Sequence, residues 1–268
     1  MAARSSTPGT TGTVDVRCAV GDLVAVAHVS GAAAPRLAVV LVHGVGSSAR
    51  AFDPVRRALL RPGPTPTAVH AIDLPGFGAA PRAPRDVTIA EHADVVAAYV
   101  RRHVLDAPGP APVVVLVGHS MGAQVVAQAM ADHPHEAAAG VLVGPTADRR
   151  ARSAPHLALR LARDAVGERP RALATLAVDY VLRCSLPHYA RQVRQMVRHR
   201  IEDVLPRVPG RVVVLRGAHD PIAPRAWVRE LAAAAPRGTW RETRGRHHAM
   251  DADPDGIVAA VLDAGGVA

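Results

Sequence analysis

The chain of 268 residues contains no lysine and no asparagine, and only 3% of its residues are aromatic. The 32 lysine-plus-arginine positions are therefore all arginine, and against 23 acidic residues they give a formal net charge of +9. The depleted residue types share AT-rich codons, so their scarcity indicates a GC-rich coding bias rather than a function. The arginines are scattered without a long basic run, which disfavours a track for nucleic acid.

Cysteines and long apolar stretches are also scarce. Cys18 and Cys184 lie far apart and outside any Cys/His pattern, which excludes a disulfide framework and disfavours structural zinc. The longest apolar runs, such as Pro112 to Val117, have the length of a strand and fall far short of a bilayer span. Residues 1–13 lack the apolar region of a signal peptide. We therefore expect a soluble, cytoplasmic protein.

The apolar residues that are present, 49% of the chain, are enough for one sizeable domain. Two alternating stretches around Val20-Gly21 predict an antiparallel hairpin. Further along, short apolar runs alternate with helical patterns, and such runs are typical of strands buried on both faces of a sheet. This alternation predicts an α/β fold with a mostly parallel sheet. The expected strands of that sheet cover residues 37–42, 67–72, 113–117, 141–143 and 212–215, with a short one near Trp240.

Residues 149–206 break the alternation, because they carry no strand signal and are rich in arginine, alanine and leucine. We expect helices here, inserted between two strands and covering the functional site. The predicted organisation is a flexible tail over residues 1–12, a core over 13–148 and 207–268, and a helical cap over 149–206. The cap helices are expected to keep their arginines in solvent and to pack through Leu157, Leu159, Leu161, Leu173 and Leu176.

The strongest local motif is Gly118-His119-Ser120-Met121-Gly122, which has the form G-x-S-x-G. A predicted buried strand enters the motif and a predicted helix leaves it. A serine on such a tight turn has a strained backbone, and flanking glycines remove the Cβ atoms that would clash. We interpret Ser120 as a nucleophile, while a capping serine in a glycine-flanked turn is the competing interpretation.

A serine hydroxyl needs a general base, commonly a histidine that a buried carboxylate orients. In strand-to-helix hydrolases the chain order is serine, acid, histidine. Asp220 is the candidate acid, because it follows the strand at 212–215, and Asp148, just after the strand at 141–143, is its rival. Both positions lie at the carboxyl edge of the sheet, where functional groups gather in open α/β folds.

The candidate base is His247 or His248, in the loop before the last helix. Counting from Gly245 selects His248, whereas counting back from Pro254 selects His247. We prefer His248, because the glycine fixes the local loop, whereas the spacing to a helix absorbs insertions more easily. The other histidine is then expected to point away.

A glycine-rich turn, His43-Gly44-Val45-Gly46, follows the first buried parallel strand. It allows the backbone to approach Ser120, so the amides of Val45 and Met121 are candidates for an oxyanion hole. We expect His43 to hold this loop through a hydrogen bond rather than to transfer protons.

Five motifs in order resemble the α/β-hydrolase superfamily: His43-Gly44, Asp73-Leu74-Pro75-Gly76-Phe77-Gly78, the Ser120 motif, Gly217 with Asp220, and Gly245 with His248. The chain looks most like capped serine hydrolases of the lipase/esterase or meta-cleavage-product-hydrolase type. The resemblance implies an eight-stranded, mostly parallel sheet, a helical cap after strand 6, and a pocket between core and cap. Members with an aspartate nucleophile are disfavoured, because position 120 is serine.

The predicted activity is hydrolysis of an ester, thioester or related acyl bond through a Ser-His-Asp triad and a covalent acyl-enzyme. Acyl transfer, C–C hydrolysis, cofactor-free peroxidation and lyase or cyclase chemistry on the same triad form the alternative. A non-enzymatic ligand-binding protein and a polyanion-binding protein are the remaining hypotheses. We expect a small-molecule acyl substrate, no cofactor, no nucleic acid and no membrane span, in a monomer or a homodimer.

Metal binding is not expected. Two groups of residues could be taken for metal clusters: His133 with His135, and the histidine pair 247–248 with Asp251. Neither has the open tetrahedral set that a catalytic zinc needs.

Overall fold

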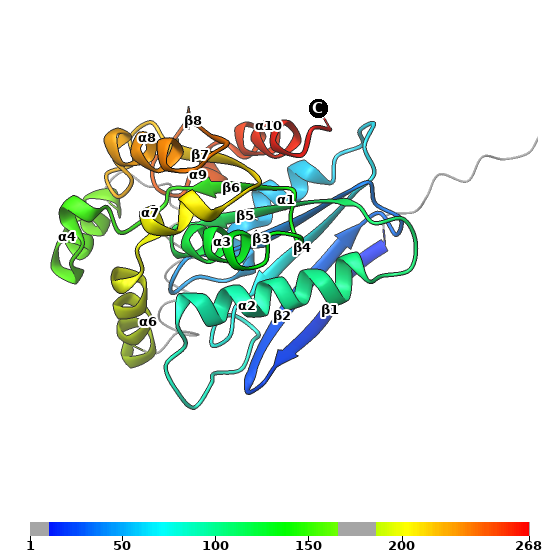
Figure 1. The fold of residues 1–268 in the computed structure, drawn as a ribbon, viewed down its shortest axis with the longest axis horizontal. Coiled ribbons are helices and arrows are strands. Elements are labelled where there is room, and N and C mark those ends of the chain that lie inside the picture. The colour runs from blue at the N-terminus through cyan, green and yellow to red at the C-terminus, as the bar shows by residue number, and fades with distance from the viewer. Residues whose placement is uncertain (1–10, 166–185, 268) are drawn as a thin grey trace, which may run out of the picture.

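An eight-stranded sheet forms the centre of the computed structural model, which describes residues 11–165 and 186–267 (Figure 1). The strand order is β1-β2-β4-β3-β5-β6-β7-β8. Only β2 runs against its neighbours, and the other adjacent pairs are parallel. The strands are β1 (Thr11–Val20), β2 (Leu23–Gly31), β3 (Leu37–Val42), β4 (Thr67–Asp73), β5 (Val113–His119), β6 (Ala139–Val143), β7 (Arg211–Gly217) and β8 (Gly238–Thr243).

The predicted fold class is confirmed, and its physical basis is burial on both faces of the central strands. Every residue of β3 and β6 is buried, and so are all but the first residues of β5 and β7. Such strands read as continuous apolar runs in the sequence. The predicted hairpin is also present: β1 and β2 pair antiparallel, and Gly21 turns the chain with a φ of 58°.

Helices cover both faces of this sheet (Figure 1). One face packs against α2 (Ile89–Val100), α3 (Met121–Asp132) and α8 (Arg225–Ala234). The other packs against η1 (Ala49–Phe52), α1 (Asp53–Leu59), α9 (Ala249–Ala252) and α10 (Pro254–Gly265). Helix α2 begins with a capping box between Thr88 and Glu91, and a π-helical turn, η2 (Arg101–Leu105), continues it.

Residues 144–210 connect β6 to β7 and are called the insertion below. All regular elements in the described part of the insertion are helices. These are η3 (Arg149–Ala151), α4 (Ala154–Ala165), α6 (Leu186–Arg198), α7 (Ile201–Val204) and η5 (Leu205–Arg207). No helix among the described residues is long and apolar enough to cross a membrane.

The packing expected for the insertion needs correction. Leu157 is buried and Leu161 packs against the core, but Leu159 is 50% exposed. Positions 157 and 161 are one helical turn apart and share a face, whereas position 159 lies on the opposite side of α4. The expectation that the arginines face solvent is also wrong for Arg152 and Arg160, which are largely buried in ion pairs. Leu173, Leu176 and most of the expected tail lie outside the described residues.

Candidate active site

Ser120 lies on a sharp turn between β5 and α3. Its φ of 56° and ψ of −114° are strained for a residue other than glycine. The flanking glycines make this turn possible, since a Cβ on Gly118 would overlap the carbonyl of Gly122, and one on Gly122 would overlap the carbonyl of Val42. The turn is fixed further by a 2.9 Å hydrogen bond from the Ser120 amide to the carbonyl of Val143.

Asp220, at the end of β7, is buried and fully hydrogen-bonded. Its Oδ1 accepts the amides of Ile222 and Ala223 at 2.7 and 3.1 Å. Its Oδ2 lies 3.0 Å from Nδ1 of His247. Burial raises the pKa of this carboxyl, but the charge and hydrogen bond of His247, together with the two amides, outweigh it and leave the pKa below its usual value.

His247, rather than His248, is the histidine that the structure joins to Asp220. The Nδ1–H of His247 donates to the carboxylate, and this hydrogen bond favours the tautomer that carries its proton on Nδ1. This arrangement disagrees with the sequence-based preference for His248 and agrees with its alternative. Spacing from Gly245 therefore selects a different histidine from the one that pairs with Asp220 in the structure.

The rival acid, Asp148, has different partners. It is buried and accepts from the guanidinium groups of Arg150 and Arg160 at 3.3 Å. Its Oδ1 also accepts the Arg150 amide and so caps a short helix. Asp148 therefore ties together the first part of the insertion, and Asp220, which pairs with a histidine, is the better candidate for the acid.

The turn after β3 brings backbone close to Ser120. A Cβ on Gly44 would lie 3.1 Å from the Cβ of Ser120, so a larger residue would crowd the serine. His43 holds the turn: its Nδ1–H donates to the carbonyl of Gly44 at 2.7 Å, and its Nε2 accepts the amide of Leu74 at 3.1 Å. Both ring nitrogens are engaged in positioning, as the sequence predicts.

A cavity of about 50 Å³ joins these elements. Ser120, His247 and Val45 line it together, so the candidate nucleophile, the candidate base and one candidate oxyanion donor face one space. The amide of Met121 is at the first position of α3, where a helix leaves its N–H groups without partners inside the helix. The remaining described lining residues are Gly44, Ser47, His119, Thr146, Leu157, Leu161, Met196, Ile222 and His248.

His119, beside the nucleophile, contributes in a way that the motif alone does not reveal. Its Nε2–H donates to the carbonyl of His247 at 3.1 Å, and its ring centroid lies 4.8 Å from that of His247. Burial lowers the pKa of His119 well below its usual value, and the neighbouring His247 and His248 add to this effect. His119 therefore remains neutral and holds the main chain of His247.

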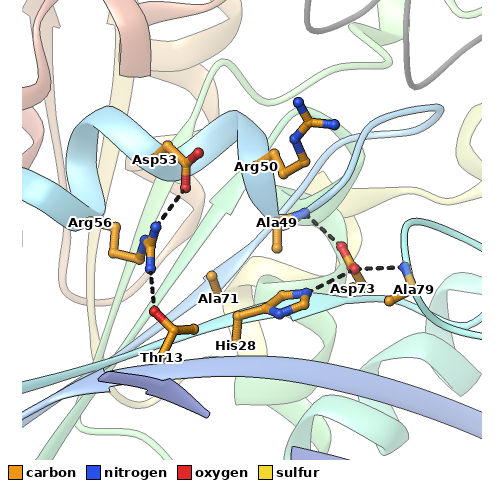
Figure 2. A pocket seen from close by; sticks show the side chains of 9 residues that line it. All are labelled: Thr13, His28, Ala49, Arg50, Asp53, Arg56, Ala71, Asp73 and Ala79. Atoms are coloured by element: carbon orange, nitrogen blue, oxygen red, sulfur yellow. Dashed lines mark hydrogen bonds and ion pairs between the residues drawn. The ribbon is translucent and has the colours of Figure 1, made fainter. Parts of the chain in front are cut away.

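The motif from Asp73 to Gly78 forms a turn that has a structural role. Figure 2 shows Asp73 accepting hydrogen bonds from the amides of Ala49 at 2.7 Å and Ala79 at 2.8 Å, and from His28 Nε2 at 3.1 Å. This carboxylate joins the segments that follow β3 and β4, in a second pocket that Ser120 does not line. Phe77 packs edge-on against the ring of His43 and so supports the turn before Val45.

The sequence carries no sign of two buried charged residues that contact the loops of Asp220 and His247. Arg216, on β7, is buried and donates to the carbonyls of Asp220 at 2.9 Å and Ala223 at 2.8 Å, which fixes the acid loop. Asp164, on α4, is buried against the loop that carries His247. A single arginine among 32 basic residues gives no sequence signal, and the position of Asp164 depends entirely on how α4 packs.

No group of three or more ligating side chains suited to a metal occurs among the described residues. Of the histidines considered as ligands, His133 instead pairs with Asp94 at 2.8 Å.

Together, the sheet, the strained serine turn and the acid–histidine pair define a hydrolase of the doubly wound type. The family model of the alpha/beta hydrolase family matches residues 39–260, and the chain belongs to this family. The match includes Ser120, Asp220 and both candidate histidines. A comparison with curated protein sequences found no match.

Solved structures agree with this fold. The enol-lactonase from Burkholderia xenovorans LB400 is 21% identical, with a TM-score of 0.74 over 93% of this chain and 99% of that one. A thermophilic esterase from Thermogutta terrifontis is 18% identical, with a TM-score of 0.71 over 94% and 97%. The N-formylmaleamic acid deformylase from Pseudomonas putida S16 is 17% identical, with a TM-score of 0.70 over 93% and 99%. At these identities the likeness establishes the fold and leaves the substrate open.

Proposed function

We propose that the protein is a serine hydrolase that cleaves an ester, thioester or related acyl bond through Ser120, His247 and Asp220. The observation that carries the proposal is that His247, which pairs with Asp220, lines one cavity together with a strained serine. A serine becomes nucleophilic when a neutral histidine removes its proton, and a carboxylate fixes the histidine tautomer for this task.

In the first half of the reaction, Ser120 Oγ attacks the acyl carbon while His247 Nε2 takes the hydroxyl proton. Asp220 stabilises the resulting imidazolium through the Nδ1–H. The amides of Val45 and Met121 hold the oxyanion of the tetrahedral intermediate. The intermediate then collapses: the bond to the leaving group breaks, and the leaving group takes the proton from Nε2.

In the second half, water replaces the leaving group. His247 Nε2 removes a proton from the water, and the hydroxide attacks the acyl–Ser120 ester. Collapse returns the proton to Ser120 Oγ and releases the carboxylic acid. The insertion acts as a cap in this proposal, because Leu157, Leu161 and Met196 line the cavity with Ser120 and restrict water around the acyl group.

The test is steady-state hydrolysis of p-nitrophenyl acetate, butyrate and octanoate by the full chain and by Ser120→Ala. We expect the wild-type protein to turn over at least one of these esters, and kcat to fall by about 10⁴-fold or more in the variant. Circular dichroism of the two proteins should superimpose, because Ser120 is at a turn and not in the core. Equal rates in both proteins would contradict the proposal.

A further inference from the structure

Helix α4 of the insertion contacts both loops that carry the proposed acid and base. The guanidinium of Arg160 donates to the carbonyl of Ile222 at 3.3 Å, in the loop of Asp220. The carboxylate of Asp164 accepts from the amide of His247 at 3.4 Å and from Nε of Arg246 at 3.2 Å. Arg160 and Asp164 are four residues apart on a helix, so they share one face of α4.

The last turn of α4 and the base loop are joined by three hydrogen bonds. Besides the two that end on Asp164, Nη2 of Arg246 donates to the carbonyl of Arg163 at 3.0 Å. Asp164 itself is 2% exposed, and a carboxylate buried to this extent is costly unless charges and donors compensate it.

The main chain of His247 is thus held from two directions. From the core, His119 donates to its carbonyl at 3.1 Å. From the insertion, Asp164 accepts from its amide. The two peptide groups on either side of the His247 Cα are thereby fixed, and their planes determine where the imidazole points.

The same helix also covers the nucleophile. Leu157 and Leu161, on the turns before Asp164, line the cavity with Ser120. A helix of this length moves as one body, so displacing the leucines to admit a substrate also removes Asp164 from the base loop. Covering the cavity and ordering the base are consequently coupled in one element.

We propose that Asp164 is a positioning residue, through which the seating of α4 over the cavity orders His247 against Asp220. The inference rests on the proposed function for its catalytic consequence, because the ordered histidine matters to turnover only if it is the base. Its structural part, the order of the His247–Asp220 hydrogen bond, stands without any reaction.

The catalytic consequence concerns kcat rather than KM. A base whose ring is displaced by about 1 Å can cost 10²-fold in rate, while substrate binding in the cavity is unaffected. A residue that only shapes the pocket would instead change KM. A residue that only stabilises the fold would lower the melting temperature and leave the kinetics of the folded protein unchanged.

The experiment compares Asp164→Ala and Asp164→Asn with Arg163→Ala, a matched control on the same turn, whose side chain is exposed. Two quantities are measured on each folded protein. One is kcat and KM for p-nitrophenyl butyrate. The other is the strongly downfield proton NMR resonance of the His247 Nδ1–H, which is assigned by its absence in His247→Asn.

We expect Asp164→Ala to lose about 10- to 100-fold in kcat with KM within about threefold of wild type, and to lose or broaden the downfield resonance. Asp164→Asn should fall between, because the amide oxygen still accepts but the charge opposite Arg246 is gone. Arg163→Ala should match wild type in both measurements.

Three results would overturn the inference: a downfield resonance in Asp164→Ala that equals the wild-type one, a change confined to KM, or a wild-type spectrum without the resonance. Failure of the proposed function gives a different pattern. In that case wild-type protein hydrolyses no ester, yet the resonance is present and still depends on Asp164.

Discussion

The two sides of the candidate active site are held by different kinds of contact. On the core side, backbone crowding and buried hydrogen bonds fix Ser120 and Asp220 at the ends of β5 and β7. On the insertion side, pairs of polar side chains connect α4 and α6 to the core: Asp164 pairs with Arg246, and Gln192 pairs with His92. The contacts on the core side break only when the sheet itself is disturbed. The side-chain pairs on the insertion side can break while the sheet stays folded.

Helix α6 illustrates the second kind of contact. Oε1 of Gln192 lies 3.1 Å from Nε2 of His92 on α2, and both residues are completely buried. One turn further along α6, the carbonyl of Met196 accepts a 3.0 Å hydrogen bond from the side-chain amide of Gln124 on α3. This interface depends on a few polar groups that need one another, so it is more sensitive to pH and substitution than the apolar core.

The largest effect is expected from breaking the core side with Gly122→Ala. The new Cβ would overlap the backbone carbonyl of Val42, and neither element can move easily, because Val42 ends the central strand β3 and Gly122 is in the first turn of α3. We expect a loss of more than about 3 kcal/mol in the free energy of unfolding, or no soluble protein.

Gly63→Ala is the matched control for this substitution. A Cβ added to Gly63 would meet only the carbonyl of Arg61, at 3.8 Å, so Gly63→Ala should leave the free energy of unfolding nearly unchanged. Urea unfolding at neutral pH measures both variants. A Gly122→Ala protein as stable as Gly63→Ala would mean that the turn is not sterically determined.

A smaller effect is expected on the insertion side when the pH falls. Burial, reinforced by the nearby His43 and His188, lowers the pKa of His92 to about 4, well below the value of a free histidine. Between that value and about pH 6.5 the unfolded chain binds a proton that the folded chain does not, so stability falls as the pH falls. The contribution of His92 is about 2 kcal/mol between pH 7 and pH 4.5.

Substitution His92→Leu removes this titrating group. Its free energy of unfolding is expected to be lower at neutral pH, because Gln192 loses its partner, but to change less between pH 7 and pH 4.5 than that of the wild type. Urea unfolding at the two pH values measures the difference. An unchanged pH dependence would show that His92 does not hold the interface in its neutral form.

The sequence predicted the core side well, for a physical reason. Runs such as residues 37–42 are apolar because both faces of the strand are buried, and glycines flank Ser120 because backbone occupies the space of their side chains. These requirements are local, so they leave a pattern in the chain. The role of His43 in holding its own loop followed from the same kind of local reasoning, whereas its contact with the amide of Leu74 did not.

The insertion side left no comparable pattern. Choosing between His247 and His248 requires the orientation of a loop, which the neighbouring strand end and His119 determine. Leu159 has the same side chain as Leu157 but lies on the opposite, exposed side of the helix. In the sequence, Asp164 looks like any acidic residue of a polar helix. Only the packing of α4 against the loop of His247 shows its contact with that loop.

The central claim is that His247 activates Ser120 and that Asp220 orients His247 through a hydrogen bond. Treating the protein with a fluorophosphonate and locating the adduct by peptide mass spectrometry tests it most directly, with His247→Ala and His248→Ala treated in parallel. We predict a single adduct on Ser120 in the wild type, labelling slowed by about 10³-fold or more in His247→Ala, and nearly wild-type labelling in His248→Ala. An unlabelled Ser120 in the wild type, or loss of labelling in His248→Ala with labelling retained in His247→Ala, would contradict the account.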